Sequence, residues 1–247
     1  MNFLSHYYFD RNSPDANQVL GSVLPDLLKN ANKFWNLHPD KKTELYSDSE
    51  FLKSIHTGWQ RHIFVDNYFH SSAFFAEHTR KIRTEIAPIL INSKVRPFFL
   101  AHIGLEIMLD SLLLTRKIVN PHHFYTHLST THRPSVDHFL QINQIEDTQI
   151  FFNFLDKFIE INYLHSYHDA ENIMFALNNI CKRIWDNPLN KIQIAQLTAF
   201  FDTYIHELQI SFMDIFAEID EIMNIPEVAV PKTSFPDASM DIEHENT

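Results

Sequence analysis

The chain has 247 residues, of which 45% are hydrophobic and 21% charged, proportions typical of a soluble globular protein with a full core. It contains 3 glycines, 16 histidines and a single cysteine, Cys181. Three glycines are too few for the turns of a many-stranded sandwich or barrel, and the sequence has no Gly-rich phosphate-binding loop. The lone cysteine excludes a disulfide framework and a cysteine-based zinc finger.

The net charge of −11 is divided unevenly along the chain. Residues 1–133 hold 15 Lys/Arg and 12 Asp/Glu, a net of +3, whereas residues 134–247 hold 5 and 19, a net of −14. The acidic total argues against nonspecific binding to nucleic acid, which needs several cations facing phosphates. The sequence shows neither a signal peptide nor an apolar run of about 18 residues, so we expect a cytoplasmic protein with no membrane segment.

Apolar residues recur at helical spacing along most of the chain. In chain order, this pattern predicts helices near residues 20–28, 48–76, 76–91, 97–119, 149–162, 168–185 and 190–223. The helix at 97–119 is apolar on most sides, which is typical of a central helix. Residues 120–149 contain Pro121, Pro134 and five histidines, and we interpret this segment as a long loop with short helical pieces.

The predicted fold class is therefore all-α, a compact bundle of roughly seven or eight helices. Residues 1–224 are expected to form a single domain, because no change in composition marks an internal boundary. Residues 225–247 contain three prolines and few large apolar side chains. We expect this segment to be a disordered tail.

Two segments place three ionisable side chains one helical turn apart. The first row is His62, Asp66 and His70, and the second is His102, Glu106 and Asp110. Positions i, i+4 and i+8 lie near one face of a helix, and large apolar residues flank both rows. Buried carboxylates and imidazoles need a partner, and a divalent cation such as Mn, Fe, Zn or Mg accepts this ligand set. A solvated polar helix face is the alternative.

The three glycines, Gly21, Gly58 and Gly104, all lie within a few residues of candidate ligands. A glycine inside a helix costs about 1 kcal/mol, so we expect either close approach of two backbones at a compact site or ordinary helix crossings. His6 lies in an apolar N-terminal stretch, and Asp26 stands at a predicted helix start. Both complete the candidate set, although Asp26 would also suit a simple helix cap.

The segments 1–6 and 21–26 resemble the start of the acyl carrier protein phosphodiesterase family, whose pattern is MNFLAH followed by G-N-(apolar)-x-x-D-F. The family motif G-x-x-x-H-x-x-I-D-x-x-x-D is similar to residues 58–70, and D-x-x-x-D-H-F-L is similar to residues 106–113. Later likeness, at residues 177–184 and in an aromatic closing helix, extends the resemblance to about residue 220. His70 and Glu106 stand where the family has Asp, and Ser111 stands where it has His.

This resemblance implies an all-α relative of the HD-type metal phosphohydrolases. Members of the family hydrolyse the phosphodiester that joins 4′-phosphopantetheine to a serine of holo-acyl carrier protein, supported by Mn²⁺. Carried over by position, the resemblance implies catalytic roles for Asp26, His62, Asp66 and His6. Together with the row spacing, it implies metal ligation by His62, Asp66, His70, Glu106 and Asp110.

Acyl carrier proteins are acidic, so an enzyme acting on them should present cations around its site. We assign this role to Arg61, Arg116 and Lys117, and we interpret the basic residues at 80–83 as a solvated face. Two other functions stay open: an HD-type phosphohydrolase acting on another phosphodiester or nucleotide, and a helical binding module that has lost turnover. A haem or metal store built from the histidines of residues 120–149 is a less favoured alternative.

Overall fold

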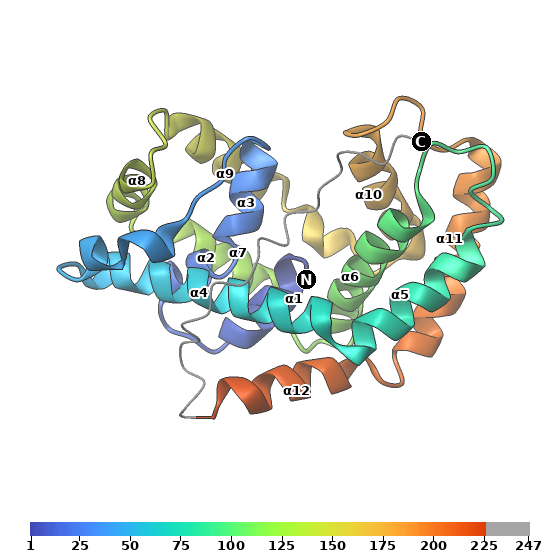
Figure 1. Cartoon of the computed structure of the whole chain (residues 1–247), viewed down its shortest axis with the longest axis horizontal. Helices are drawn as coiled ribbons and strands as arrows, with labels where there is room; N and C mark the ends of the chain where they lie inside the picture. The colour runs from blue at the N-terminus through green and yellow to red at the C-terminus, as the bar shows by residue number, and fades with distance from the viewer. Residues whose placement is uncertain (226–247) are drawn as a thin grey trace.

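The computed structural model describes residues 1–225, and this part of the chain is all-α, as predicted (Figure 1). Two 3-10 helices, Pro39–Tyr46 and Tyr163–Ser166, accompany twelve α-helices. The α-helices are α1 (Phe3–Asp10), α2 (Ala16–Gly21), α3 (Leu24–Ala31), α4 (Glu50–Ser71), α5 (Ala73–Ile86), α6 (Pro97–Thr115), α7 (Pro121–Ser129), α8 (Arg133–Ile142), α9 (Gln149–Ile161), α10 (Ala170–Lys182), α11 (Lys191–Leu208) and α12 (Phe212–Met223). The predicted tail lies, except for Ile225, outside the described residues.

More helices form than the roughly seven or eight expected, because α1, α7 and α8 add to the predicted segments, and the segments at 20–28 and 190–223 each belong to two helices. Ser72 ends α4 in an extended conformation, and its side chain accepts a hydrogen bond from the backbone N–H of Phe75 to start α5. The segment predicted at 190–223 is likewise two helices, interrupted at residues 209–211. The apolar pattern in the sequence continues across such short breaks. A prediction from this pattern therefore gives one long helix where the structure has two.

Residues 120–149, interpreted as a long loop with short helical pieces, are more helical than that, because α7 and α8 occupy most of the segment. Pro121 and Pro134 lie in the first turns of these helices, where a missing backbone N–H costs nothing and the restricted φ favours helix. The side chain of Asn120 caps α7 by accepting from the N–H of His122. The prolines therefore start helices here instead of breaking them.

Helix α6 is the central helix, as its apolar sequence predicted. Most of its residues are buried, and α1, α5, α10 and α11 all pack against it. It is long and apolar enough to cross a membrane by length and composition, but 67% of that stretch is buried inside the structure. This burial is consistent with the core helix of a soluble protein.

The 22-residue helix α4 runs across the molecule in front of α1 and α6 in Figure 1, and it crosses α2 at very short range. At this crossing the two glycines Gly21 and Gly58 face each other's backbones. A Cβ built on Gly58 would lie 2.1 Å from the carbonyl oxygen of Gln18, and one on Gly21 would lie 2.2 Å from that of Ile55. Only hydrogen fits at either position.

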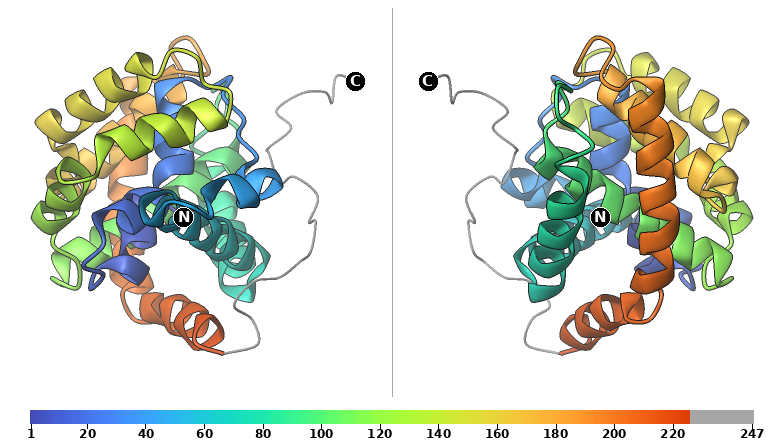
Figure 2. Two further views of the ribbon diagram at one scale, coloured as in Figure 1. Left: turned by 90° about the vertical axis from the view of Figure 1, so that its left-hand side faces the viewer. Right: turned by 90° about the vertical axis from the view of Figure 1, so that its right-hand side faces the viewer.

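The remaining helices enclose this centre from several sides. Figure 2 shows α11 along one side of the molecule and α12 at its base, where α12 packs against α4. Helices α8 and α9 lie at the opposite end of the molecule from α11 (Figure 1). Helices α1, α4 and α6 are therefore the elements that meet in the interior, and they carry the polar residues singled out from the sequence.

We expect Gly58→Ala to destabilise the protein by about 3 kcal/mol or more, because the new methyl group meets backbone atoms that cannot move aside. The gain in helix propensity, about 1 kcal/mol, is smaller. Urea unfolding measures the difference. Gly104→Ala is the comparison variant, since its Cβ would meet the ring of Phe201, at 2.8 Å, and no backbone atom, so we expect a smaller loss of stability. Equal stability of Gly58→Ala and the unmodified protein would contradict this account.

Candidate metal centre

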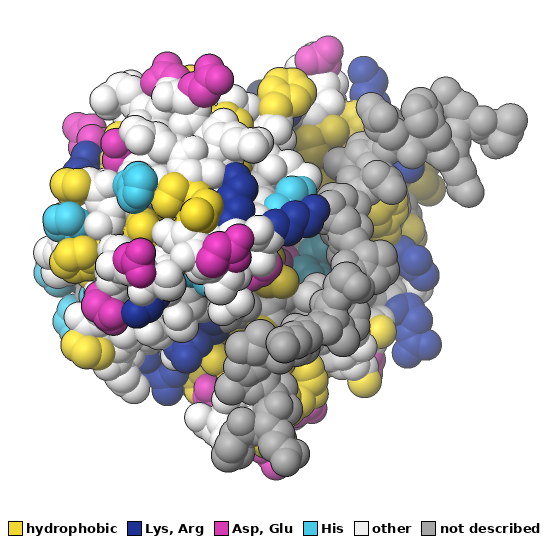
Figure 3. Space-filling model, turned by 60° about the vertical axis from the view of Figure 1, so that its left-hand side comes forward, with side chains coloured by type: hydrophobic (Ala, Val, Ile, Leu, Met, Phe, Trp, Pro, Cys, Tyr) yellow, Lys and Arg dark blue, Asp and Glu magenta, His cyan; other side chains and the backbone are white. Residues whose placement is uncertain are grey.

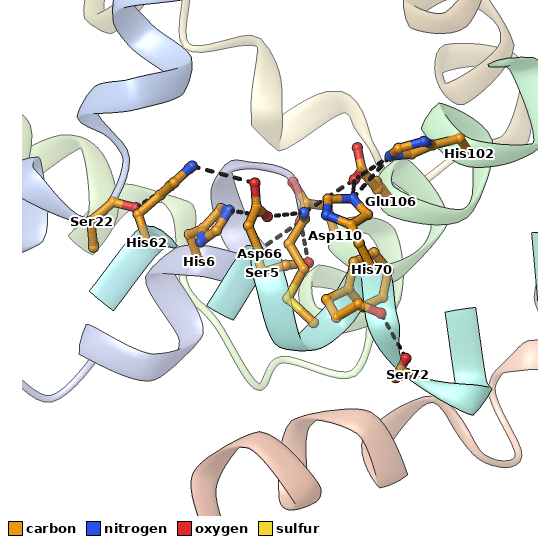
Figure 4. A network of polar contacts seen from close by, with 12 residues as sticks. Ser5, His6, Ser22, His62, Asp66, His70, Ser72, His102, Glu106 and Asp110 are labelled. Atoms are coloured by element: carbon orange, nitrogen blue, oxygen red, sulfur yellow. Dashed lines mark hydrogen bonds and ion pairs between the residues drawn. The ribbon is translucent and has the colours of Figure 1, made fainter. Parts of the chain in front are cut away.

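Histidines and carboxylates converge where α1, α4 and α6 meet (Figure 4). They form two sets of three in which the potential ligand atoms all lie within 4.8 Å of one another. The first triad is His6, His62 and Asp66, and the second triad is His70, His102 and Glu106. The two predicted rows on α4 and α6 thus face each other, and both triads combine residues from different helices.

His62 of the first triad is held in one tautomer by the glycine crossing. Its Nδ1 lies 2.9 Å from the backbone oxygen of Ser22, and a carbonyl oxygen can only accept, so Nδ1 carries the proton. Nε2 then has a free lone pair and points toward Asp66, at 3.6 Å from Oδ2. Burial lowers the pKa of His62, against the opposing charge of Asp66, so the ring is neutral and suited to metal ligation.

His6 is the least satisfied polar side chain of the centre. It is 1% exposed and stacks on His62 with ring centroids 3.8 Å apart. Its Nε2 lies 3.2 Å from Oδ1 of Asp66, yet neither ring nitrogen has a partner in hydrogen-bond geometry among residues 1–225. Burial, together with the neighbouring His62, lowers its pKa to about 4. A neutral imidazole aimed at a carboxylate without such a partner is costly, and a cation bound between them would satisfy both.

The second triad is a nearly equilateral triangle of ligand atoms. Nε2 of His70 lies 3.0 Å from Nε2 of His102 and 3.2 Å from Oε1 of Glu106, and the third side is 3.1 Å. These three contacts cannot all be hydrogen bonds, because each Nε2 carries at most one proton and the ionised carboxylate carries none. Ligands bonded to one divalent ion at about 2.0–2.2 Å are separated by about 3.0–3.5 Å, so this spacing fits a His₂–carboxylate metal site.

The amino group of Met1 lies between the triads, 2.6 Å from Oδ1 of Asp66 and 3.1 Å from Oε1 of Glu106. Burial opposes its charge, but the two carboxylates outweigh that effect and raise its pKa to about 11. Burial also opposes ionisation of Asp66 and Glu106, yet the amino group and the nearby histidines hold the pKa of both carboxyls well below the usual range. The carboxylates of the two triads thus share positive charge as one electrostatic site.

The triads differ in access to solvent. The side chains of His6 and His62 are 1% and 3% exposed, whereas those of His70 and His102 are 30% and 19% exposed. A molecule approaching from solvent therefore reaches the second triad more directly.

Asp110, predicted as a metal ligand, lies outside both triads. Its carboxylate is fully buried and accepts hydrogen bonds from the backbone N–H groups of Leu4 and Ser5, at 3.0 and 2.8 Å, and from the hydroxyl of Ser5 at 2.6 Å. It therefore holds the first turn of α1 in place, where backbone donors have no helical partner. Burial outweighs these bonds and raises its pKa to about 7.

Asp26, at the start of α3, is half-buried and also belongs to neither triad. Burial raises its pKa to about 7; His6 opposes this rise and Asp66 adds to it. Asp26 therefore interacts electrostatically with two members of the first triad. It is a group that can exchange a proton near neutral pH.

His102 is the ligand candidate that the sequence assignment missed. It begins the second row, and its position four residues before Glu106 was the available signal. Ser111, which replaces the histidine of the family pattern, is buried, and its Oγ has no hydrogen-bond partner in the described chain. The histidines of α7 and α8 form no comparable set of three within residues 1–225.

Two of the three cations predicted at the mouth of the site have partners outside the triads. Arg61 forms an ion pair with the buried carboxylate of Asp10. Arg116 donates to the side chain of Gln209 and follows Glu106 by ten residues, about 15 Å along the helix axis, with Lys117 next to it. At the left and centre of the face in Figure 3, basic side chains stand near acidic ones and form no continuous basic patch.

The described chain is thus an all-α protein with two sets of potential metal ligands at its centre. Comparisons with protein families, with curated proteins and with solved structures give no match.

Asp110 should make stability fall as the pH rises from about 4 to about 7. Its pKa is about 7 in the folded protein and about 3.9 in an unfolded chain, so the folded state binds more protons in this interval. Asp110→Asn removes this titration while keeping one oxygen acceptor for Ser5. Relative to the variant, the unmodified protein should therefore lose up to about 4 kcal/mol of unfolding free energy between pH 4 and 8.

A series of urea unfolding curves over this pH range measures the difference between the two proteins. Asp202→Asn, which replaces an exposed carboxylate on α11, is the control. Its unfolding free energy should differ from that of the unmodified protein by the same amount at every pH. A constant difference between Asp110→Asn and the unmodified protein at every pH would rule out the raised pKa.

Proposed function

We propose that the protein is a divalent-metal-dependent phosphodiesterase. The observation that carries this proposal is the pair of His₂–carboxylate triads that share charge at the junction of α1, α4 and α6. The unpartnered His6 and the triangular spacing of the second triad both fit a cation such as Mn²⁺. When bound, such a cation neutralises charge that develops on a phosphodiester and lowers the pKa of a coordinated water.

The protonation states of the site residues indicate which of them would bind the cation and which would transfer a proton. Asp66 and Glu106 are ionised and would hold the cation, together with the neutral ring of His62. With a pKa of about 4, His6 is a poor proton donor at neutral pH and suits ligation instead. Asp26, with a pKa of about 7, is the group best matched to donate a proton to the departing oxygen or to accept one from water.

The resemblance of residues 1–6, 21–26, 58–70 and 106–113 to the acyl carrier protein phosphodiesterases supports holo-acyl carrier protein as the substrate. One observation favours a second candidate, another phosphodiester of smaller size. The engagement of Arg61 by Asp10 removes a cation expected to attract an acidic protein partner. Both candidates use the same centre, and they differ only in what docks around it.

The activity is tested by incubating the purified protein with Mn²⁺ and holo-acyl carrier protein and measuring the intact mass of the carrier protein. We expect loss of the 4′-phosphopantetheine group, with bis(p-nitrophenyl) phosphate as a parallel small substrate. Cleavage of the small diester alone would favour the second candidate. No cleavage of either by protein shown to contain metal would contradict the proposal and leave a binding module.

Single substitutions at the centre should weaken Mn²⁺ binding by at least tenfold, because each removes one ligand from a small set. His62→Ala tests the first triad and Glu106→Gln the second, with binding followed by isothermal titration calorimetry. His206→Ala, an exposed histidine on α11, is the matched control and should leave the affinity unchanged. If His206→Ala weakened binding as much as the other two, the ions would be bound elsewhere.

A further inference from the structure

A groove of about 280 Å³ runs between α5 and α6 and ends at the second triad. Its lining includes Phe75, Thr79, Arg80, Arg83, Phe98 and His102. On α5, Phe75, Thr79 and Arg83 follow one another at four-residue steps, and Arg80 lies three residues before Arg83, so all four lie toward one side of that helix. This is the face that sequence analysis interpreted as solvated.

His102 joins the groove to the candidate metal centre, because it lines the groove and belongs to the second triad. Phe75 reinforces the junction: its ring meets those of His70 and His102 edge-on, with centroids 5.0 Å away in both cases. A group bound in the groove would therefore lie directly beside the more exposed triad.

The charge of the groove is unbalanced. Arg80 and Arg83 both line it and are exposed, and neither has an ion pair or side-chain hydrogen bond within residues 1–225. No carboxylate is among the lining residues. Lys81, which lies between the two arginines in sequence, points elsewhere and pairs with Glu207. Two guanidinium groups on one wall, without a counter-charge, favour an anion that both can contact.

We propose that this groove binds a phosphate group and presents it to the second triad. Planar guanidinium groups donate pairs of hydrogen bonds to phosphate oxygens, which makes arginine well suited to this anion. The volume is at the low end of ligand sites, so it takes a phosphate with a short adjoining chain. Binding of the anion needs only the groove; its presentation for cleavage rests on the proposed function.

The test is calorimetric titration of the full chain with inorganic phosphate and with 4′-phosphopantetheine, at low salt, with and without Mn²⁺. The double variant Arg80→Gln/Arg83→Gln should bind both probes at least tenfold more weakly. Lys81→Gln removes a charge from the same helix but not from the groove, and its affinity should stay within twofold. Circular dichroism checks that both variants are folded.

No phosphate binding by the unmodified protein, or equal weakening in Lys81→Gln, would overturn the groove assignment. Tighter binding of 4′-phosphopantetheine than of inorganic phosphate supports the groove and indicates an organic phosphate as its ligand; equal binding supports a site for the anion alone. The two proposals fail separately. Phosphate binding without any diesterase activity removes the proposed function and leaves the groove, whereas cleavage with unchanged KM and phosphate affinity in the double variant removes the groove.

Discussion

The need to balance charge away from water shapes the centre of this protein. Asp66, Glu106 and Asp110 bring three carboxyl groups to the junction of α1, α4 and α6. Each is accommodated differently. The Met1 amino group and the histidines favour ionised Asp66 and Glu106, whereas the N–H groups of α1 bond to Asp110 without offsetting the effect of its burial. An isolated buried charge would cost several kcal/mol, so the three helices are stable together only in an arrangement that satisfies all three carboxyls.

Helix crossing and polar chemistry are coupled at α4. At the crossing of α2 and α4, Gly21 and Gly58 let the two backbones approach closely, and this brings the carbonyl oxygen of Ser22 to Nδ1 of His62. The hydrogen bond between these two atoms leaves Nε2 of His62 to face Asp66. The glycine crossing thus determines the tautomer of His62, a candidate ligand one helical turn after Gly58. For Gly21 and Gly58, close backbone approach at a site and an ordinary helix crossing are therefore the same contact between α2 and α4.

Helical spacing predicted the all-α fold and the two facing rows, but not which side chains in each row would meet. Four residues turn a helix by about 40° beyond a full turn, so Asp110 points about 80° away from His102 and reaches α1. His102 has the better position for the second triad, although no motif marks it. Contacts between residues distant in sequence could not be predicted either, because nothing near Arg61 in the sequence indicates its ion pair with Asp10. A proline such as Pro121 can end a helix or begin one, and its residue type alone does not decide between the two.

The triads differ in how much of the chain must be assembled to complete them. The second triad takes its members from α4 and α6 only, whereas the first needs His6 from α1, which Asp110 holds against α6. In the proposed metal centre, the second set would therefore be complete without α1, whereas the first would need α1 packed against α6. The affinity of the inner position for a cation would then report on the docking of the amino-terminal helix.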